Sequence, residues 1–118
     1  MRTFARFEII GRVGKQKEVG STLRISLAAE YGRKDEKGDF QSKPYWNEVT
    51  IFNDSVAKWI RDHTDVGDLV RAAGTVRQTQ WENDQGGTEY GITMAAEDFD
   101  NFSHDERRRQ ARKTEQSQ

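Results

Sequence analysis

The fold is decided by residues 45–80, which read YWNEVTIFNDSVAKWIRDHTDVGDLVRAAGTVRQTQ. Residues 45–52 are rich in aromatic and β-branched side chains, which predicts a strand. Asp54 is a suitable N-cap, and apolar residues then recur at helical spacing, so we expect a helix that ends near residue 63. A second strand is predicted over residues 69–80, with Gly74 at its centre, where a small barrel needs a sharp bend.

Three further strands are expected around this stretch. Apolar and polar residues alternate over residues 6–13 and 22–29, which predicts two strands that each bury one face. The polar residues 32–44, which end in the only proline, are expected to form a solvated, mobile loop. Residues 83–87 predict a hairpin turn that leads into a fifth strand. The expected buried face of that strand is Tyr90, Ile92, Met94 and Ala96.

The order of these elements is three strands, one helix and two strands. This is the order of an OB-fold, an all-β barrel of five strands with a helix between strands 3 and 4. We expect the barrel to span residues 1–102 and a short basic tail to span residues 103–118. Residues 103–106 match a capping box, so a short helix is predicted over 103–115, followed by disordered polar residues.

Composition excludes several classes of protein. The 118 residues suit one domain, and the mean hydropathy of −1.00 leaves no apolar run near the ~20 residues that cross a bilayer. The chain has no cysteine, and the N-terminus carries no secretory leader pattern, so a cytoplasmic protein is expected. With two histidines and no phosphate-binding glycine motif, we expect no metal site, no cofactor and no enzymatic activity.

The formal net charge of −1 conceals an uneven distribution. Residues 1–43 carry a charge of +4, residues 44–102 carry −7, and residues 103–118 carry +2. A net charge near zero argues against binding a polyanion through bulk charge. Any such binding would therefore need a localised basic path.

Large aromatic side chains lie on the predicted polar faces of two strands. In the third strand, Trp46 and Phe52 share a face with Glu48 and Thr50, opposite Tyr45, Val49 and Ile51. In the fourth strand, Arg71, Arg77 and Trp81 share the polar parity. Exposed rings interleaved with arginine are typical of single-stranded nucleic acid binding, where rings stack on bases and cations follow the phosphates. For a single outward tryptophan, a covering loop or partner subunit is the alternative interpretation.

Three other aromatic residues are less clearly placed. Trp59 lies at helical spacing and is expected to pack the helix. Tyr31 has the buried parity of its strand, unless a bulge intervenes. Phe40 lies in the polar loop, where it would either reach a ligand or pack on the barrel.

The chain resembles the bacterial-type single-stranded DNA-binding proteins (the SSB family) over about residues 5–100. The segments that carry the resemblance are IIGRVG (9–14), ISLAA (25–29), YWNEVTIF (45–52), GDLVRAAG (67–74) and TQW (79–81). The resemblance implies an OB-fold that binds and protects single-stranded DNA without sequence preference, in replication, recombination or repair. It also implies a homo-oligomer, usually a tetramer joined through first strands.

The resemblance also assigns residues. Its base-stacking positions fall on Trp46, Phe52 and Trp81. A further tryptophan of the family, near the end of the second strand, has no tryptophan here: Tyr31 is the nearest aromatic residue, and strict alignment places Arg33 at that position. The expected phosphate contacts are Arg2, Arg6, Arg12, Lys15, Arg33, Lys34, Lys43, Arg71 and Arg77. The family typically ends in an acidic tip that recruits repair proteins. This chain ends in a basic segment, so partners of that kind are not expected, unless the sequence is a shortened form.

One other function remains open for the aromatic face. Aromatic residues are also preferred anchors at protein interfaces. The same fold could therefore serve as a protein-binding or accessory module of a primosome-like system. Salt separates the two functions, because phosphate binding weakens steeply with salt and an apolar interface does not.

Overall fold

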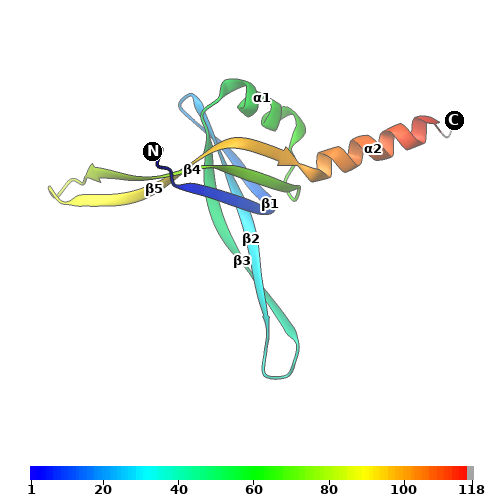
Figure 1. Ribbon diagram of the computed structural model, residues 1–118, viewed down its shortest axis with the longest axis horizontal. Helices are drawn as coiled ribbons and strands as arrows, with labels where there is room; N and C mark the ends of the chain where they lie inside the picture. The colour runs from blue at the N-terminus through cyan, green and yellow to red at the C-terminus, as the bar shows by residue number, and fades with distance from the viewer. Residues whose placement is uncertain (117–118) are drawn as a thin grey trace.

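The computed structural model describes residues 1–116, which form five strands and two helices (Figure 1). The elements are β1 (Arg6–Val19), β2 (Thr22–Lys34), β3 (Phe40–Ile51), α1 (Asp54–His63), β4 (Leu69–Glu82), β5 (Thr88–Asn101) and α2 (Phe102–Gln116). The strands close into a barrel in the order β1-β2-β3-β5-β4. The expected OB-fold, with its helix between β3 and β4, is confirmed.

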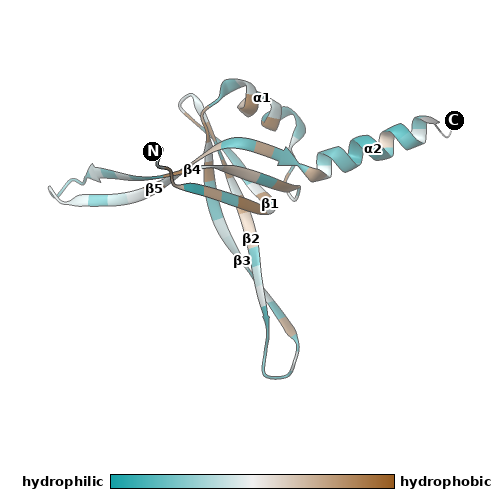
Figure 2. Cartoon of the chain, viewed as in Figure 1, coloured by the Kyte–Doolittle hydropathy of each residue, from teal (hydrophilic) through white to brown (hydrophobic). Residues whose placement is uncertain are grey.

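The core lies inside the barrel and under α1. Its fully buried side chains come from alternate positions of β2, β3 and β4, as the period of two along a strand requires. They include Leu23, Ile25, Leu27, Val49, Ile51 and Val70. Helix α1 adds Ala57 and Ile60, and its N-cap is Asn53, whose side chain accepts a hydrogen bond from the Val56 N–H, rather than Asp54. In Figure 2 the apolar residues concentrate in the barrel strands.

Gly74 is a point of close backbone approach between β4 and β5. The register between these strands shifts at Ala73/Gly74, and a side chain at Gly74 would overlap the carbonyl oxygen of Ala95. The expected irregularity in this strand is therefore confirmed, because only glycine fits where the two backbones come this close.

Two hairpins extend beyond the barrel as arms. The β2–β3 arm continues to the pair Lys34↔Phe40, and the β4–β5 arm continues to Glu82↔Thr88. Figure 1 shows them projecting in different directions. The prediction of a mobile loop over residues 32–44 was wrong, since only residues 35–39 connect the strands. A hairpin that satisfies its own backbone hydrogen bonds needs no apolar composition, so the polar sequence concealed it.

The buried face predicted for β5 is correct only within the barrel. Ala96 is buried and Met94 is partly buried against the core. Tyr90 and Ile92 have the same parity but lie on the β4–β5 arm, where they are exposed. In β2 the expected alternation ends at Leu27, since Ala28 is buried and Ala29 is only partly so. At Tyr90 and Ile92 the strand continues past the end of the barrel, where parity no longer determines burial.

Helix α2 begins at the end of β5. It starts one residue before the predicted start, because Asn101 acts as its cap and accepts a hydrogen bond from the His104 N–H at 2.8 Å. The disorder predicted after residue 115 falls mainly outside the described residues. Within residues 1–116, no helix has the length and apolar character that a membrane crossing requires.

Candidate nucleic-acid interface

Where β3 forms part of the barrel, its outer face carries the exposed ring of Trp46, and Phe52 continues that parity one residue beyond the strand. Trp46 and Phe52 remain 61% and 54% exposed, whereas Val49 and Ile51 between them are fully buried. The predicted parity is therefore confirmed for these four residues, but not for Tyr45, which is exposed, or for Thr50, which is buried. The Trp46 ring lies against Gly14 of β1, where a side chain would overlap it. The absence of a side chain at Gly14 thus allows the indole to rest on the sheet while its other surface stays open.

Phe52 lies beside Arg77 across the barrel surface. The two side chains line one shallow hollow with Ala95, Ala96 and Glu97 of β5. This hollow exists because β3 and β5 are neighbours in parallel, with Thr50 opposite Ala95. An aromatic ring and a guanidinium 25 positions apart in sequence are thereby brought to the same site, which suits one base and its phosphate.

Trp81 extends this surface along the β4–β5 arm. The outer face is continuous from β3 to β4, because Ala95 pairs with Thr50 on one side and with Thr75 on the other. Trp81 has the same parity as Thr75, is 50% exposed, and lies over Gly91. The three predicted stacking residues therefore occupy one connected outer surface.

The β2–β3 arm carries aromatic residues on both faces. Phe40 shares the parity of Trp46 and lies over Gly32 of the facing strand. Tyr31 is on the opposite face, where its ring meets that of Tyr45 edge-on at a centroid distance of 5.6 Å. Sequence reasoning placed Tyr45 on a buried face, but it lies where the arm leaves the barrel and is exposed.

Basic side chains surround the Tyr31–Tyr45 pair. The ammonium group of Lys43 lies 5.3 Å from the centroid of the Tyr45 ring, which is a cation–π distance. Arg33 and Lys43 line a hollow with the two tyrosines. A mirrored Tyr-x-Arg and Lys-x-Tyr pattern, at residues 31–33 and 43–45, is the sequence signal that could have identified this group.

Some of the predicted phosphate-binding residues are held by contacts within the protein, and the others make no ion pair. Arg71 donates hydrogen bonds to Glu8 at 2.8 Å and Asp100 at 3.0 Å, and these partners raise the pKa of its guanidinium. Arg6 lies 3.8 Å from Glu97, and Arg12 donates to the carbonyl oxygen of Gly67. Within the described residues, the following make no ion pair: Arg2, Lys15, Arg33, Lys34, Lys43 and Arg77.

Trp59 is placed differently from the other tryptophans. Its ring contacts those of His63 and His104, with centroid distances of 5.0 and 5.2 Å. It thus packs α1 against α2, in agreement with the predicted role in helix packing. No three side chains of histidine, aspartate or glutamate in residues 1–116 are grouped as metal ligands would be.

A closed barrel of this topology with an exposed aromatic face defines the class of OB-fold binding proteins. The chain belongs to the Single-strand binding protein family, whose model matches residues 4–102. It is 24% identical over 99 residues to a single-stranded DNA-binding protein of Rhizobium meliloti (strain 1021). That match covers 77% of this chain and 56% of the relative, so the chain spans about half the length of that relative.

Solved structures of similar fold come from distant organisms. A Plasmodium falciparum SSB in complex with ssDNA aligns with a TM-score of 0.68 and 17% identity, over 86% of this chain and 97% of the other. The mitochondrial single-stranded DNA-binding protein of S. cerevisiae gives 0.64 and 20%, with the same coverage. A small single-stranded DNA-binding protein of Streptomyces coelicolor gives 0.61 and 17%, over 85% and 95%. At these identities the likeness establishes the fold.

Proposed function

We propose that this protein binds and protects single-stranded DNA without sequence preference. The observation that carries the proposal is the connected outer surface that bears Trp46, Phe52 and Trp81, with Arg77 beside Phe52. Each stacked base contributes about 1–3 kcal/mol, and every base offers a π-face, so binding of this kind tolerates any sequence. A structural relative described as an SSB complex with ssDNA supports the same proposal.

The phosphates would be met by cations that make no ion pair within residues 1–116. On the β2–β3 arm these are Lys34, opposite Phe40, and Arg33 and Lys43, on the face of the two tyrosines; on the barrel they are Lys15 and Arg77. Arg71 is held by two carboxylates, which favours a structural role for it. A localised set of this size explains how a chain of net charge −1 can bind a polyanion.

The proposed biological setting is replication, recombination or repair in the cytoplasm, with no catalytic step. Family membership supports it, because the family is defined by single-strand binding rather than by a reaction.

We further propose a homo-oligomer, with a tetramer as the expected form. Residues 6–11 of β1 pair with β4 along one edge, whereas pairing with β2 begins only at Arg12. In residues 1–116 no strand occupies the second edge of this segment. An unpaired strand edge is a template for another chain, so two copies could join here through β1. Light scattering at several protein concentrations tests this.

Protein binding through the same aromatic face is the competing function. An apolar interface would lose little affinity as salt rises, whereas binding to single-stranded DNA loses affinity with a slope of about 0.7 per phosphate contact on a log–log plot. Titration at two salt concentrations therefore distinguishes them.

The direct test is titration with oligothymidylate while the intrinsic tryptophan emission is measured. We expect quenching at low salt, because Trp46 and Trp81 are exposed on the proposed path. Trp46→Ala and Trp81→Ala should each weaken binding by about 1–3 kcal/mol. Trp59→Phe is the control and should bind as the wild type, because its ring packs on histidines elsewhere. Unchanged emission of the wild type at low salt would refute the proposal.

A further inference from the structure

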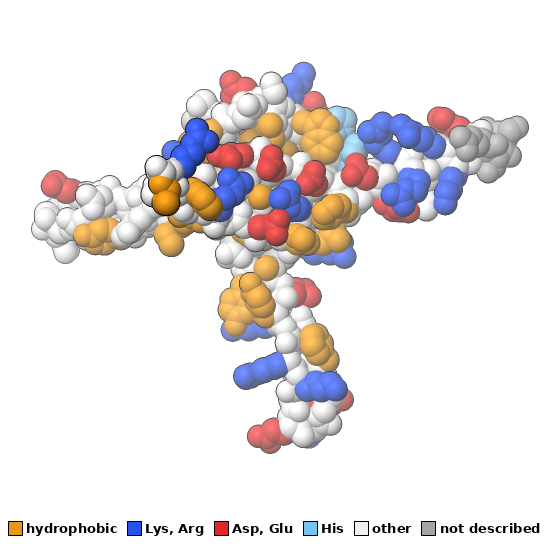
Figure 3. Space-filling model, in the orientation of Figure 1, with side chains coloured by type: hydrophobic (Ala, Val, Ile, Leu, Met, Phe, Trp, Pro, Cys, Tyr) orange, Lys and Arg blue, Asp and Glu red, His pale blue; other side chains and the backbone are white. Residues whose placement is uncertain are grey.

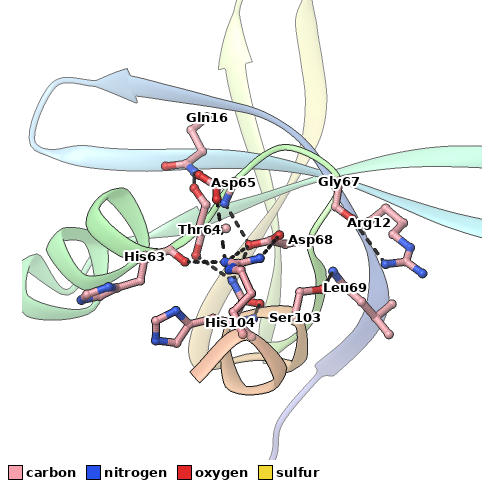
Figure 4. A network of polar contacts seen from close by, with 12 residues as sticks. Arg12, Gln16, His63, Thr64, Asp65, Gly67, Asp68, Leu69, Ser103 and His104 are labelled. Carbon is pink, nitrogen blue, oxygen red and sulfur yellow. Dashed lines mark hydrogen bonds and ion pairs between the residues drawn. The ribbon is translucent and has the colours of Figure 1, made fainter. Parts of the chain in front are cut away.

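Helix α2 is fixed to the barrel by a buried polar network (Figure 4). Arg107 donates to both carboxylate oxygens of Asp68, at 2.8 and 3.0 Å. The Asp68 carboxylate also accepts a hydrogen bond from Asn101 at 2.9 Å, and both residues are almost completely buried. Asn101 donates as well to Thr64 at 3.2 Å. This network joins β5, α2 and the segment between α1 and β4.

Two additional contacts hold the first turn of α2. The hydroxyl oxygen of Ser103 accepts a hydrogen bond from the backbone N–H of Leu69 at 2.9 Å. The ring of His104 packs against Trp59 and against His63, at 5.2 and 4.9 Å between centroids. The direction of α2 is therefore set by side chains of its first six residues, Phe102 to Arg107, and the rest of the helix projects from the barrel (Figure 1).

The projecting part of α2 carries a row of arginines. Arg108, Arg109 and Arg112 line one shallow hollow together with Asp105. These positions are spaced i, i+3, i+4 and i+7, so they form one face of the helix. Of the three cations, Arg109 pairs with Glu106 at 3.0 Å, an exposed pair of little energetic weight. Figure 3 shows basic side chains gathered along this helix.

The composition of α2 indicates the kind of partner it fits. A helix that packs on protein has an apolar stripe, but the residues of α2 after Phe102 are polar or charged apart from Ala111. Its basic residues are mainly arginine, whose planar guanidinium binds phosphate through two parallel hydrogen bonds. Charge and shape complementarity thus favour a phosphate-rich polymer over a protein surface.

We propose that the arginine face of α2, formed by Arg108, Arg109 and Arg112, is a second binding site for the phosphates of single-stranded DNA. The inference rests on the proposed function, because it uses the same ligand. Strand β5 connects the two surfaces: its first residues face Trp81, and its last residue caps α2. On the intervening part, Glu97 and Asp100 are paired with Arg6 and Arg71, whereas Asp98 is exposed and makes no ion pair within residues 1–116.

The position of α2 determines which DNA can reach it. A helix of 15 residues is about 22 Å long, so its arginines lie well away from the aromatic surface. A single OB-fold contacts about 4–16 nucleotides. Only a strand that continues beyond this length should contact α2, and the contact should depend on oligonucleotide length.

The test compares Arg108→Gln/Arg112→Gln with the wild type on two lengths of oligothymidylate. With about 40 nucleotides, we expect the variant to bind several-fold more weakly and to lose about 1.4 from the salt slope, which corresponds to two phosphates. With about eight nucleotides, both proteins should bind equally, because so short a strand fits the barrel alone. The conservative variant Arg108→Lys/Arg112→Lys should keep most of the slope, because it keeps the charge.

Lys58→Gln/Arg61→Gln is the control, because it removes two exposed positive charges from the other helix, one of which, Arg61, pairs with Glu18 at 2.9 Å. It should bind both oligonucleotides as the wild type does. If the α2 variant behaves like this control on the long strand, the inference about α2 is wrong while the proposed function stands. If the wild type binds neither strand, the proposed function fails, and the inference fails with it.

Discussion

The indole of Trp46 packs directly on Gly14, in the space that a side chain at this position would occupy. A Cβ placed on Gly14 would overlap the six-membered part of the ring. The same relation recurs between Phe40 and Gly32 on the β2–β3 arm. Glycine on a neighbouring strand thus lets an exposed ring lie close to the sheet, which limits its freedom before a base arrives and lowers the entropic cost of stacking.

The first prediction concerns the contact between Gly14 and Trp46. Gly14→Ala should push the Trp46 ring out of position and weaken binding to oligothymidylate, at most by the amount that one stacked base contributes, about 1–3 kcal/mol. The measurement is fluorescence titration, with thermal unfolding to show that the barrel is retained. Because the effect acts through the ring, Gly14→Ala should cost little in a Trp46→Ala background. Equal losses in both backgrounds would contradict this prediction.

The second prediction uses the two faces of the β2–β3 arm. Phe40 and Tyr31 are 68% and 67% exposed, so replacing either with alanine removes a similar exposed ring. Phe40 shares a face with Trp46, whereas Tyr31 lies on the other face with Tyr45. We therefore expect Phe40→Ala to weaken binding by about 1–3 kcal/mol and Tyr31→Ala to weaken it less. The reverse order in a titration would place the DNA on the tyrosine face.

The third prediction separates two arginines of β4. Arg77→Gln should reduce the salt slope of binding by about 0.7, the value for one phosphate on a single strand. Arg71→Gln should leave the slope unchanged and lower Tm, because Arg71 links Glu8 of β1 to Asp100 of β5. The measurements are binding at several salt concentrations and thermal unfolding. A loss of slope in Arg71→Gln would show that DNA competes with the two carboxylates.

The features that the sequence predicts well are those that depend on local geometry, namely the faces of a strand and the spacing of a helix. The outward positions of Trp46 and Phe52 follow from the period of two along a strand, which holds wherever a strand covers a core. The helix of residues 54–63 follows in the same way from its apolar spacing. These properties depend only on neighbours in sequence, so the aromatic surface could be located without a structure.

Other features depend on where the barrel ends. Ile92 has core parity but is exposed, because β4 and β5 continue beyond the point where other strands cover them. Tyr45 is exposed for the same reason on the other arm. The two carboxylates around Arg71 come from distant parts of the chain, and no spacing in the sequence indicates that they meet. Burial and ion pairing across strands therefore needed the structure.

The last prediction concerns the Asp68–Arg107 pair and pH. The hydrogen bonds from Arg107, with further ones from Asn101 and the Asp65 N–H, hold the pKa of Asp68 well below its ordinary value of 3.8, although burial opposes them. A carboxylate with a lower pKa in the folded state stabilises the fold above its unfolded pKa. This stabilisation is lost as pH falls toward the folded pKa, so the free energy of unfolding should decline below about pH 5.

Asp68→Asn should therefore be less stable than the wild type at neutral pH by about 1–3 kcal/mol, because buried groups lose a charged hydrogen-bond partner. Its stability should also fall less steeply in acid, since the titrating group is gone. Urea unfolding from pH 7 down to about pH 2 covers the upper part of the range over which the stabilisation is lost. Asp65→Asn is the matched control: its side chain is 80% exposed and lies 3.8 Å from Arg107, so it should follow the wild-type profile. A parallel acid decline in Asp68→Asn and the wild type would show that another group causes it.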